Sequence, residues 1–118
     1  LSPNLLKSYI FVNQLEVIFM KKLFISQPMK GKTDEEILAE RSDAIQAAKD
    51  AVGEDVELID SFFQNAPAEA RSLWFLGKSL ELLSTADIAY FAPGWSEARG
   101  CKIEHQCAVA YGIHHITA

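Results

Sequence analysis

The sequence predicts an α/β protein in which a small parallel sheet lies between two layers of helices. Three observations support this class. Apolar runs of three or four residues recur along the chain, segments with helical apolar spacing lie between them, and Pro or Gly residues separate the two. Alternating strands and helices of this length favour right-handed βαβ units, and we expect a three-layer α/β/α domain with four to five parallel strands.

The first predicted elements are a buried strand over 23–25 and a loop over 26–32. Thr33 and Glu36 then form a capping box, in which a Thr cap is followed three residues later by Glu at the start of a helix. Apolar residues keep helical spacing up to Gly53, which is expected to stop that helix.

The second half of the chain continues the alternation. Pro67 suits the first turn of a helix, and a leucine stripe at helical spacing would form its buried face. The predicted elements are a strand over 56–59, a helix after Pro67 with Leu73, Leu76, Leu80 and Leu83 on its face, a strand over 88–91 ended by Pro93 and Gly94, a helix over 100–112 and a strand over 113–116.

Residues 1–19 are interpreted as an N-terminal extension, and residues 20–118 as one domain. Met20–Lys22 before the apolar Leu23–Ile25 looks like a natural protein start. The extension has apolar runs interrupted by polar residues, and it lacks the basic start of a signal peptide. It is expected to be an upstream addition, with an extra strand at a sheet edge or a subunit contact as the alternative.

The composition fits one compact domain, because 49% of the 118 residues are hydrophobic and 23% are charged. A net charge of −5 predicts no general attraction to nucleic acid. The apolar runs are too short for a membrane span, so we expect a cytoplasmic protein. Cys101 and Cys107 would stand about 9 Å apart on one helix, which predicts free thiols in a reducing compartment. Cys101 and His105 are a single pair of candidate ligands, so no metal site is predicted.

Glu104 is the most informative residue, because a helix over 100–112 would place it in the middle of an apolar stripe. A carboxylate among apolar neighbours should have a raised pKa, and sequences tolerate it mainly where it is paired or does chemistry. The alternative is a structural Glu bonded to a loop or a subunit partner. Arg41, on an otherwise apolar helical face, is a candidate for a buried ion pair with Glu104. The stripe consists of Cys101, Ile103, Cys107, Ala108 and Tyr111.

Ligands of open parallel sheets sit beyond the carboxyl ends of the strands, so the loops at that edge should form the binding site. Glu104 lies in the helix entered from the third loop and is expected to point into the same crevice. Aromatic rings and carboxylates together suit a nucleoside, whose base would stack while its sugar meets the acids. The residues expected to bind substrate are Ser26, Gln27, Met29, Gly31, Asp60, Phe62, Trp95 and Gly100, with Phe63 as a further aromatic wall.

Three segments carry a resemblance to a known family: residues 23–29 (LFISQPM), residues 86–91 (ADIAYF) and residues 99–112 (RGCKIEHQCAVAYG). In order and spacing they resemble the nucleoside 2-deoxyribosyltransferase-like superfamily, particularly its small phage and bacterial members. A Gly-x-x-x-Glu-x-x-x-Ala-like segment carries the catalytic Glu of that family, and Glu104 occupies this position. The resemblance covers nearly all of the core and implies a flavodoxin-like fold.

The resemblance also implies cleavage or transfer of the N-glycosidic bond of a (deoxy)nucleoside or its 5′-monophosphate. Glu104 would attack C1′ as the nucleophile, and Asp87 or Glu97 would help to protonate the leaving base. Glu97 stands where transferases of the family usually carry an Asp. Lys30 and Lys32 loosely resemble a basic loop of related nucleotide hydrolases. No cofactor or metal is implied, and family members commonly associate, which implies a homodimer or a larger homo-oligomer.

Two other classes of function stay open. One is a non-catalytic module that binds or sequesters a nucleotide, of a kind that a phage could encode. The other is an assembly protein that uses Trp95 and its helix faces for contacts. Asp87 could simply begin a strand, and Asp60 could serve only in a turn.

Overall fold

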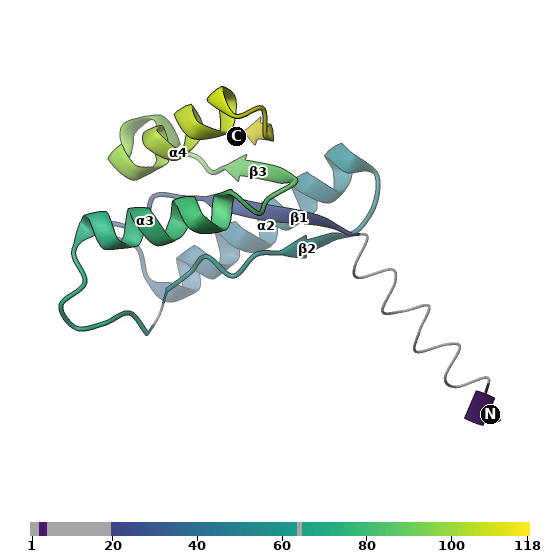
Figure 1. Cartoon of the computed structure of the whole chain (residues 1–118), viewed down its shortest axis with the longest axis horizontal. Helices are drawn as coiled ribbons and strands as arrows, with labels where there is room; N and C mark the ends of the chain where they lie inside the picture. Colours follow the sequence, from purple (N-terminus) through teal and green to yellow (C-terminus); the bar gives the residue numbers. More distant parts are fainter. Residues whose placement is uncertain (1–2, 5–19, 64) are drawn as a thin grey trace.

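The computed structural model describes residues 3–4, 20–63 and 65–118 (Figure 1). Strands and helices alternate along the described chain. The interpretation of residues 1–19 as an extension falls, for all but two of them, outside the described residues. The elements are β1 (Lys21–Ser26), α2 (Asp34–Val52), β2 (Val56–Leu58), α3 (Ser72–Leu83), β3 (Ile88–Phe91), the 3₁₀ turn η1 (Trp95–Glu97), α4 (Arg99–Ala110) and β4 (His114–Thr117).

The four strands form one parallel sheet in the order β2-β1-β3-β4. Leu23 of β1 pairs with Leu58 of β2 on one side and with Ile88 of β3 on the other. This is the strand order of flavodoxin-like folds, so the predicted fold class is confirmed. Because the chain leaves β1 toward one edge of the sheet and β3 toward the other, their carboxyl ends mark the point where such sheets bind ligands.

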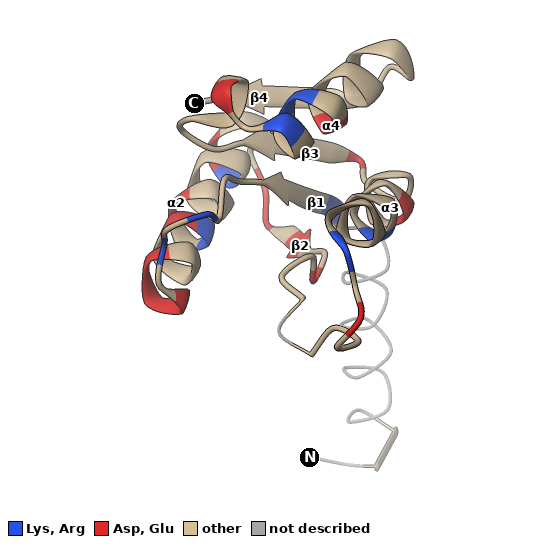
Figure 2. Ribbon diagram, turned by 90° about the vertical axis from the view of Figure 1, so that its left-hand side faces the viewer, with Lys and Arg blue, Asp and Glu red and all other residues tan. Residues whose placement is uncertain are grey.

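The core has two parts, one on each face of the sheet, and Figure 2 shows α2 on one side and α3 on the other. Side chains of β1 alternate between them, because Leu23 and Ile25 pack toward α2 whereas Phe24 packs toward α3 and α4. All four residues of β3 are buried. The α2 side also holds Ala44, Ala48, Val56, Ile88, Tyr90 and Ala92, and the opposite side holds Leu83, Ala89, Phe91 and Ala108.

The two ends of α2 follow the predicted signals. Thr33 Oγ1 accepts a hydrogen bond from Glu36 N at 3.2 Å, which satisfies one of the free N–H groups of the first turn. Gly53 has a φ of 75°, a left-handed conformation that Gly adopts without strain, and its N–H donates to Lys49 O at 2.8 Å. The helix between these caps has charges of both signs on its exterior (Figure 2).

α3 differs from the prediction in its start and in its buried face. It begins at Ser72, while Pro67 belongs to an earlier turn in which Ala70 N donates to Pro67 O at 3.0 Å. Leu83 is buried, but Leu73 at the other end of the helix is 76% exposed. Figure 1 shows that the first turns of α3 extend past the ends of the strands.

α4 buries a narrower stripe than the periodicity predicts. Cys101, Glu104 and Ala108 are buried, whereas Tyr111 follows the last helical residue and is 84% exposed. The buried stripe therefore ends near the last turn of the helix. No helix in the described part of the chain is long and apolar enough to cross a membrane.

Candidate functional site

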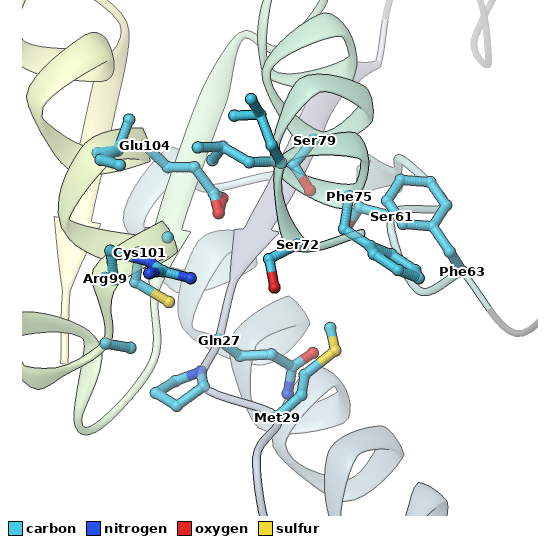
Figure 3. A pocket seen from close by; sticks show the side chains of 16 residues that line it. Gln27, Met29, Ser61, Phe63, Ser72, Phe75, Ser79, Arg99, Cys101 and Glu104 are labelled. Carbon is cyan, nitrogen blue, oxygen red and sulfur yellow. The ribbon is translucent and has the colours of Figure 1, made fainter. Parts of the chain in front are cut away.

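A cavity of about 580 Å³ lies beyond the carboxyl ends of the strands, where the fold predicts a ligand site. Its volume falls within the range of small-molecule sites. Four segments line it: the loop after β1, the loop after β2, the first turns of α3 and the first turns of α4 (Figure 3). The lining residues are Gln27, Pro28, Met29, Ser61, Phe63, Ser72, Leu73, Phe75, Leu76, Ser79, Ala98, Arg99, Gly100, Cys101, Ile103 and Glu104.

Glu104 reaches this cavity from α4, and its carboxylate points away from its own helix toward α3 (Figure 3). The residue is 7% exposed, and Oε2 has no hydrogen-bond partner among the described residues. Burial raises the pKa of Glu104 to about 7, while the nearby Ser26 hydroxyl opposes the rise. The carboxylate is therefore buried with a raised pKa, as the sequence predicts, and it lines a cavity large enough for a ligand.

Cys101 and Ser26 lie beside Glu104. Burial raises the pKa of the Cys101 thiol, the Ser26 hydroxyl opposes this rise, and the charge of Glu104 adds to it. Such a thiol stays protonated at neutral pH, so Cys101 is a poor nucleophile. Ser26 ends β1 and is 2% exposed, and its Oγ has no hydrogen-bond partner in the described structure. Cys101 and Cys107 are both free, as predicted.

The predicted ion pair between Arg41 and Glu104 is wrong, because no salt bridge joins them among the described residues. Arg41 lies on α2 and Glu104 on α4, on opposite faces of the sheet. Arg41 is buried and donates to Gln27 Oε1 at 3.1 Å and to Ser61 Oγ at 3.3 Å. Its Nη2 also donates to Ile59 O at 3.3 Å. Burial lowers the pKa of Arg41. The guanidinium thus holds two residues of the cavity wall in place from the other layer of the protein.

Gln27 lines the cavity, but its amide is already occupied. Its Oε1 accepts from Arg41, and its Nε2 donates to Ile37 O at 3.2 Å and to Glu40 Oε1 at 3.1 Å. Lys32 Nζ binds the same Glu40 carboxylate at 2.8 Å. Gln27 therefore serves mainly to join the end of β1 to α2.

Two of the predicted acids lie away from the cavity. Asp87 precedes β3, so it stands at the amino end of the sheet, where its carboxylate accepts a hydrogen bond from Lys22 N at 2.8 Å. Asp60 is exposed, and its Oδ1 accepts from Phe62 N at 3.4 Å, a local turn contact. These positions fit the alternative interpretations, in which Asp87 begins a strand and Asp60 serves in a turn.

Glu97 lies in η1 and lines a second, neighbouring cavity of about 600 Å³. It is absent from the wall around Glu104, so its predicted role as an acid there lacks geometric support. Gly100 lines both cavities, and no atom outside its own turn of helix lies within 4 Å of the position that a Cβ would take, which leaves room for a ligand. Gly31 belongs to a turn outside both cavities, with a φ of 79°.

The aromatic wall contains one of the three predicted aromatic residues, Phe63, and one residue that was not predicted, Phe75. Trp95 stacks on His105 with ring centroids 4.1 Å apart and does not line the Glu104 cavity, and neither does Phe62. Phe63 does line it, as predicted, and its ring lies 6.4 Å from that of Phe75. The first turns of α3, which extend past the sheet, thus supply the second ring.

The sequence prediction missed the polar groups that α3 and α4 bring to the cavity. Ser72 and Ser79 are seven residues apart, two helical turns, so they share one side of α3. This spacing is visible in the sequence beside the leucine stripe. Arg99 extends its guanidinium toward the cavity (Figure 3) and takes part in no salt bridge with any described residue.

The fold and the site define a flavodoxin-like α/β protein with a buried carboxylate at a cavity beside the switch point of the sheet. No protein-family model, no curated protein and no solved structure matches this chain. The resemblance to the nucleoside 2-deoxyribosyltransferase-like superfamily therefore stays a prediction from three sequence segments. Within residues 3–4, 20–63 and 65–118, no group of three or more His, Cys, Asp or Glu side chains could hold a metal ion.

Replacing Glu104 with Gln should stabilise the fold at alkaline pH. The carboxyl ionises near pH 4.5 when unfolded and near 7 when folded, so the native state loses stability as the pH rises between these values. The full loss of stability is roughly 3–4 kcal/mol, at about 1.4 kcal/mol per pKa unit, and the Gln variant does not undergo it. Urea unfolding at pH 5 and pH 8 measures the effect, which should be large at pH 8 and small at pH 5.

Glu97→Gln is the matched control for this experiment. It removes an exposed carboxylate from the neighbouring turn and should leave the pH dependence of unfolding as in the wild type. If Glu104→Gln and the wild type differed equally at both pH values, the burial of an ionisable Glu104 would be refuted.

Proposed function

We propose that this chain cleaves or transfers the N-glycosidic bond of a nucleoside or a nucleoside 5′-monophosphate, with Glu104 as the nucleophile. The observation that carries the proposal is a buried carboxylate, unpartnered at Oε2, on the wall of a cavity of about 580 Å³. A carboxyl group whose pKa is raised by burial in a cleft is typical of catalytic sites. The resemblance of the segment around Glu104 supports the same chemistry.

The other walls of the cavity suit the parts of a nucleotide. Phe63 and Phe75 offer aromatic surface to a base. Arg99 offers a planar guanidinium, which binds phosphate in a bidentate manner. Ser72 and Ser79 add hydroxyls that can donate to, or accept from, oxygen atoms of the sugar or the phosphate.

In the first step, an oxygen of Glu104 forms a bond to C1′ while the bond between C1′ and the base nitrogen breaks. The electron pair of that bond stays on the base, which takes a proton from water, because neither Asp87 nor Glu97 lines the cavity. The transition state has oxocarbenium character, so the negative charge of the carboxylate stabilises it. The product is a glycosyl ester of Glu104 and the free base.

In the second step, water or a second base attacks C1′ and releases the carboxylate. Attack by water, with loss of its proton to solvent, gives the free sugar and completes a hydrolysis. Attack by the nitrogen of another base, with loss of its N–H proton to solvent, gives a new nucleoside and completes a transfer. The first step needs Glu104 ionised, because the carboxylate is the nucleophile, so turnover should rise as the pH increases through about 7.

A second candidate is a module that binds a nucleotide without turning it over. It is favoured by one observation. Among the described residues that line the cavity, Glu104 is the one carboxylate, so none of them offers a second acid to the leaving base. Such a module would use the same aromatic rings and guanidinium. Binding without release of base would distinguish it from the enzyme.

We further propose that the chain associates into a homodimer or a larger homo-oligomer. Apolar side chains exposed at the first turns of α3 and the end of α4 support this, since such surface is often covered by a partner. The residues concerned are Leu73, Phe75, Val109 and Tyr111.

The Glu104→Gln variant should lose turnover at least a thousandfold, because the amide cannot form the ester intermediate. The assay incubates the protein with nucleosides, their 5′-monophosphates and a second free base, and separates the products by chromatography. Free base alone indicates a hydrolase, and a new nucleoside indicates a transferase. Glu97→Gln should keep the wild-type rate, and full activity in Glu104→Gln would refute the nucleophile assignment.

The Arg99→Ala variant should raise KM for nucleoside 5′-monophosphates about 10- to 100-fold, as expected for the loss of a charged hydrogen bond worth roughly 1.5–3 kcal/mol. KM for the free nucleosides should change little. Lys102→Ala, which removes an exposed cation from the same helix, serves as the control. Equal changes for phosphorylated and free substrates would show that Arg99 does not bind the phosphate.

A further inference from the structure

Two buried oxygen atoms beside the cavity have no hydrogen-bond partner among the described residues, Ser26 Oγ and Glu104 Oε2. Ser26 is 2% exposed and Glu104 is 7% exposed, so solvent does not satisfy these atoms. Buried polar atoms in folded proteins are nearly always bonded, and an exception usually has a functional reason. The two exceptions lie on β1 and α4, and the Ser26 hydroxyl is near enough to the Glu104 carboxylate to lower its pKa.

The fold brings these atoms together at the end of the sheet. Ser26 is the last residue of β1 and pairs in register with Phe91, the last residue of β3. α4 follows η1 and buries Cys101 and Glu104, which share one helix face because they are three residues apart. The Ser26 hydroxyl lies close enough to both side chains to lower the pKa of each.

We propose that Ser26 is a positioning residue for Glu104, whose hydroxyl donates to Oε2 when the carboxylate is ionised and thereby leaves Oε1 directed at the cavity. A hydroxyl can rotate, and an ionised carboxylate can only accept, so the two atoms are complementary. When Glu104 is protonated, the Cys101 sulfur is a weaker alternative acceptor for the same hydroxyl. The hydrogen bond to the charged form is the stronger one, so Ser26 favours ionisation.

The cationic side chains near the site do not account for the shifted pKa of Glu104. Arg99 lies at the cavity wall, Lys32 is paired with Glu40, and Arg41 is bonded to Gln27 and Ser61 on the far side of the sheet. α3 contributes hydroxyl and apolar side chains to the cavity wall. Burial and the Ser26 hydroxyl are the causes of the Glu104 shift, so a change at Ser26 should act on Glu104 directly.

The test is a titration of the Glu104 carboxyl by NMR with ¹³C-labelled glutamate, in which Glu104→Gln identifies the signal. Ser26→Ala should raise the pKa of Glu104 by about one unit, a tenfold change in its ionisation constant, because a charge-assisted hydrogen bond is lost. Ser26→Thr keeps the hydroxyl and should return the pKa toward the wild-type value. An unchanged pKa in Ser26→Ala would overturn the proposal.

Ser61→Ala is the matched control. Ser61 is also buried at the cavity and also follows a strand, but its Oγ is bonded to Arg41 and to Ile25 O. Its loss should leave the pKa of Glu104 in place, and an equal rise in Ser61→Ala would assign the effect to general disturbance of the cavity. Thermal unfolding at pH 5 checks the fold, and there Ser26→Ala should keep the wild-type Tm, since Glu104 is protonated and Ser26 Oγ has no other partner among the described residues.

The role of Ser26 can be tested without the proposed function, because the titration uses no substrate. Only the expected effect of Ser26 on turnover rests on that function. A shifted pKa in a protein that releases no base would refute the glycosidic proposal and keep the role of Ser26. Turnover that depends on Glu104, together with an unchanged Glu104 pKa in Ser26→Ala, would keep the glycosidic proposal and refute the role of Ser26. In an active protein, the pH midpoint of kcat/KM should rise in Ser26→Ala together with the pKa.

Discussion

The removal of one carboxylate from water is the physical constraint on which this site depends. Glu104 lies on the buried face of α4 between Cys101 and Ala108, where an apolar residue would pack without loss of stability. The fold instead contains a group whose ionisation opposes folding at and above neutral pH. A residue that lowers stability and lines a cavity is best explained by a functional role.

The rest of the fold forms the cavity around this carboxylate and holds its walls in place by packing and hydrogen bonds. The order β2-β1-β3-β4 sends α2 to one face of the sheet and α3 and α4 to the other, which opens a crevice at the ends of β1 and β3. Arg41 crosses between the layers and bonds both Gln27 and Ser61. The first turns of α3 extend past the sheet and close the opposite side of the crevice.

Local patterns in the sequence predicted the elements and the buried Glu104, because helical period, caps and strand runs depend on near neighbours. Asp87 was predicted to lie near the substrate, although the strand prediction itself argued against this position. A residue that precedes a parallel strand lies at the amino end of the sheet, opposite the end where ligands bind. The stacking of Trp95 on His105 and the partners of Arg41 depend on loop paths and layer assignment, which periodicity does not encode. The contribution of α3 to the cavity wall was not predicted, because the leucine stripe was expected to be buried along the whole helix. In the structure Leu83 is buried, whereas Leu73 at the other end is exposed.

Trapping of the covalent intermediate tests the central claim most directly. A 2′-deoxy-2′-fluoroarabinonucleoside and its 5′-monophosphate carry a fluorine that destabilises the oxocarbenium-like transition state, so a glycosyl ester that has formed should accumulate. Mass spectrometry of the intact protein and of its peptides should find the fluorinated sugar attached to Glu104. An intact mass that does not change, or an adduct on any other residue, would contradict the account.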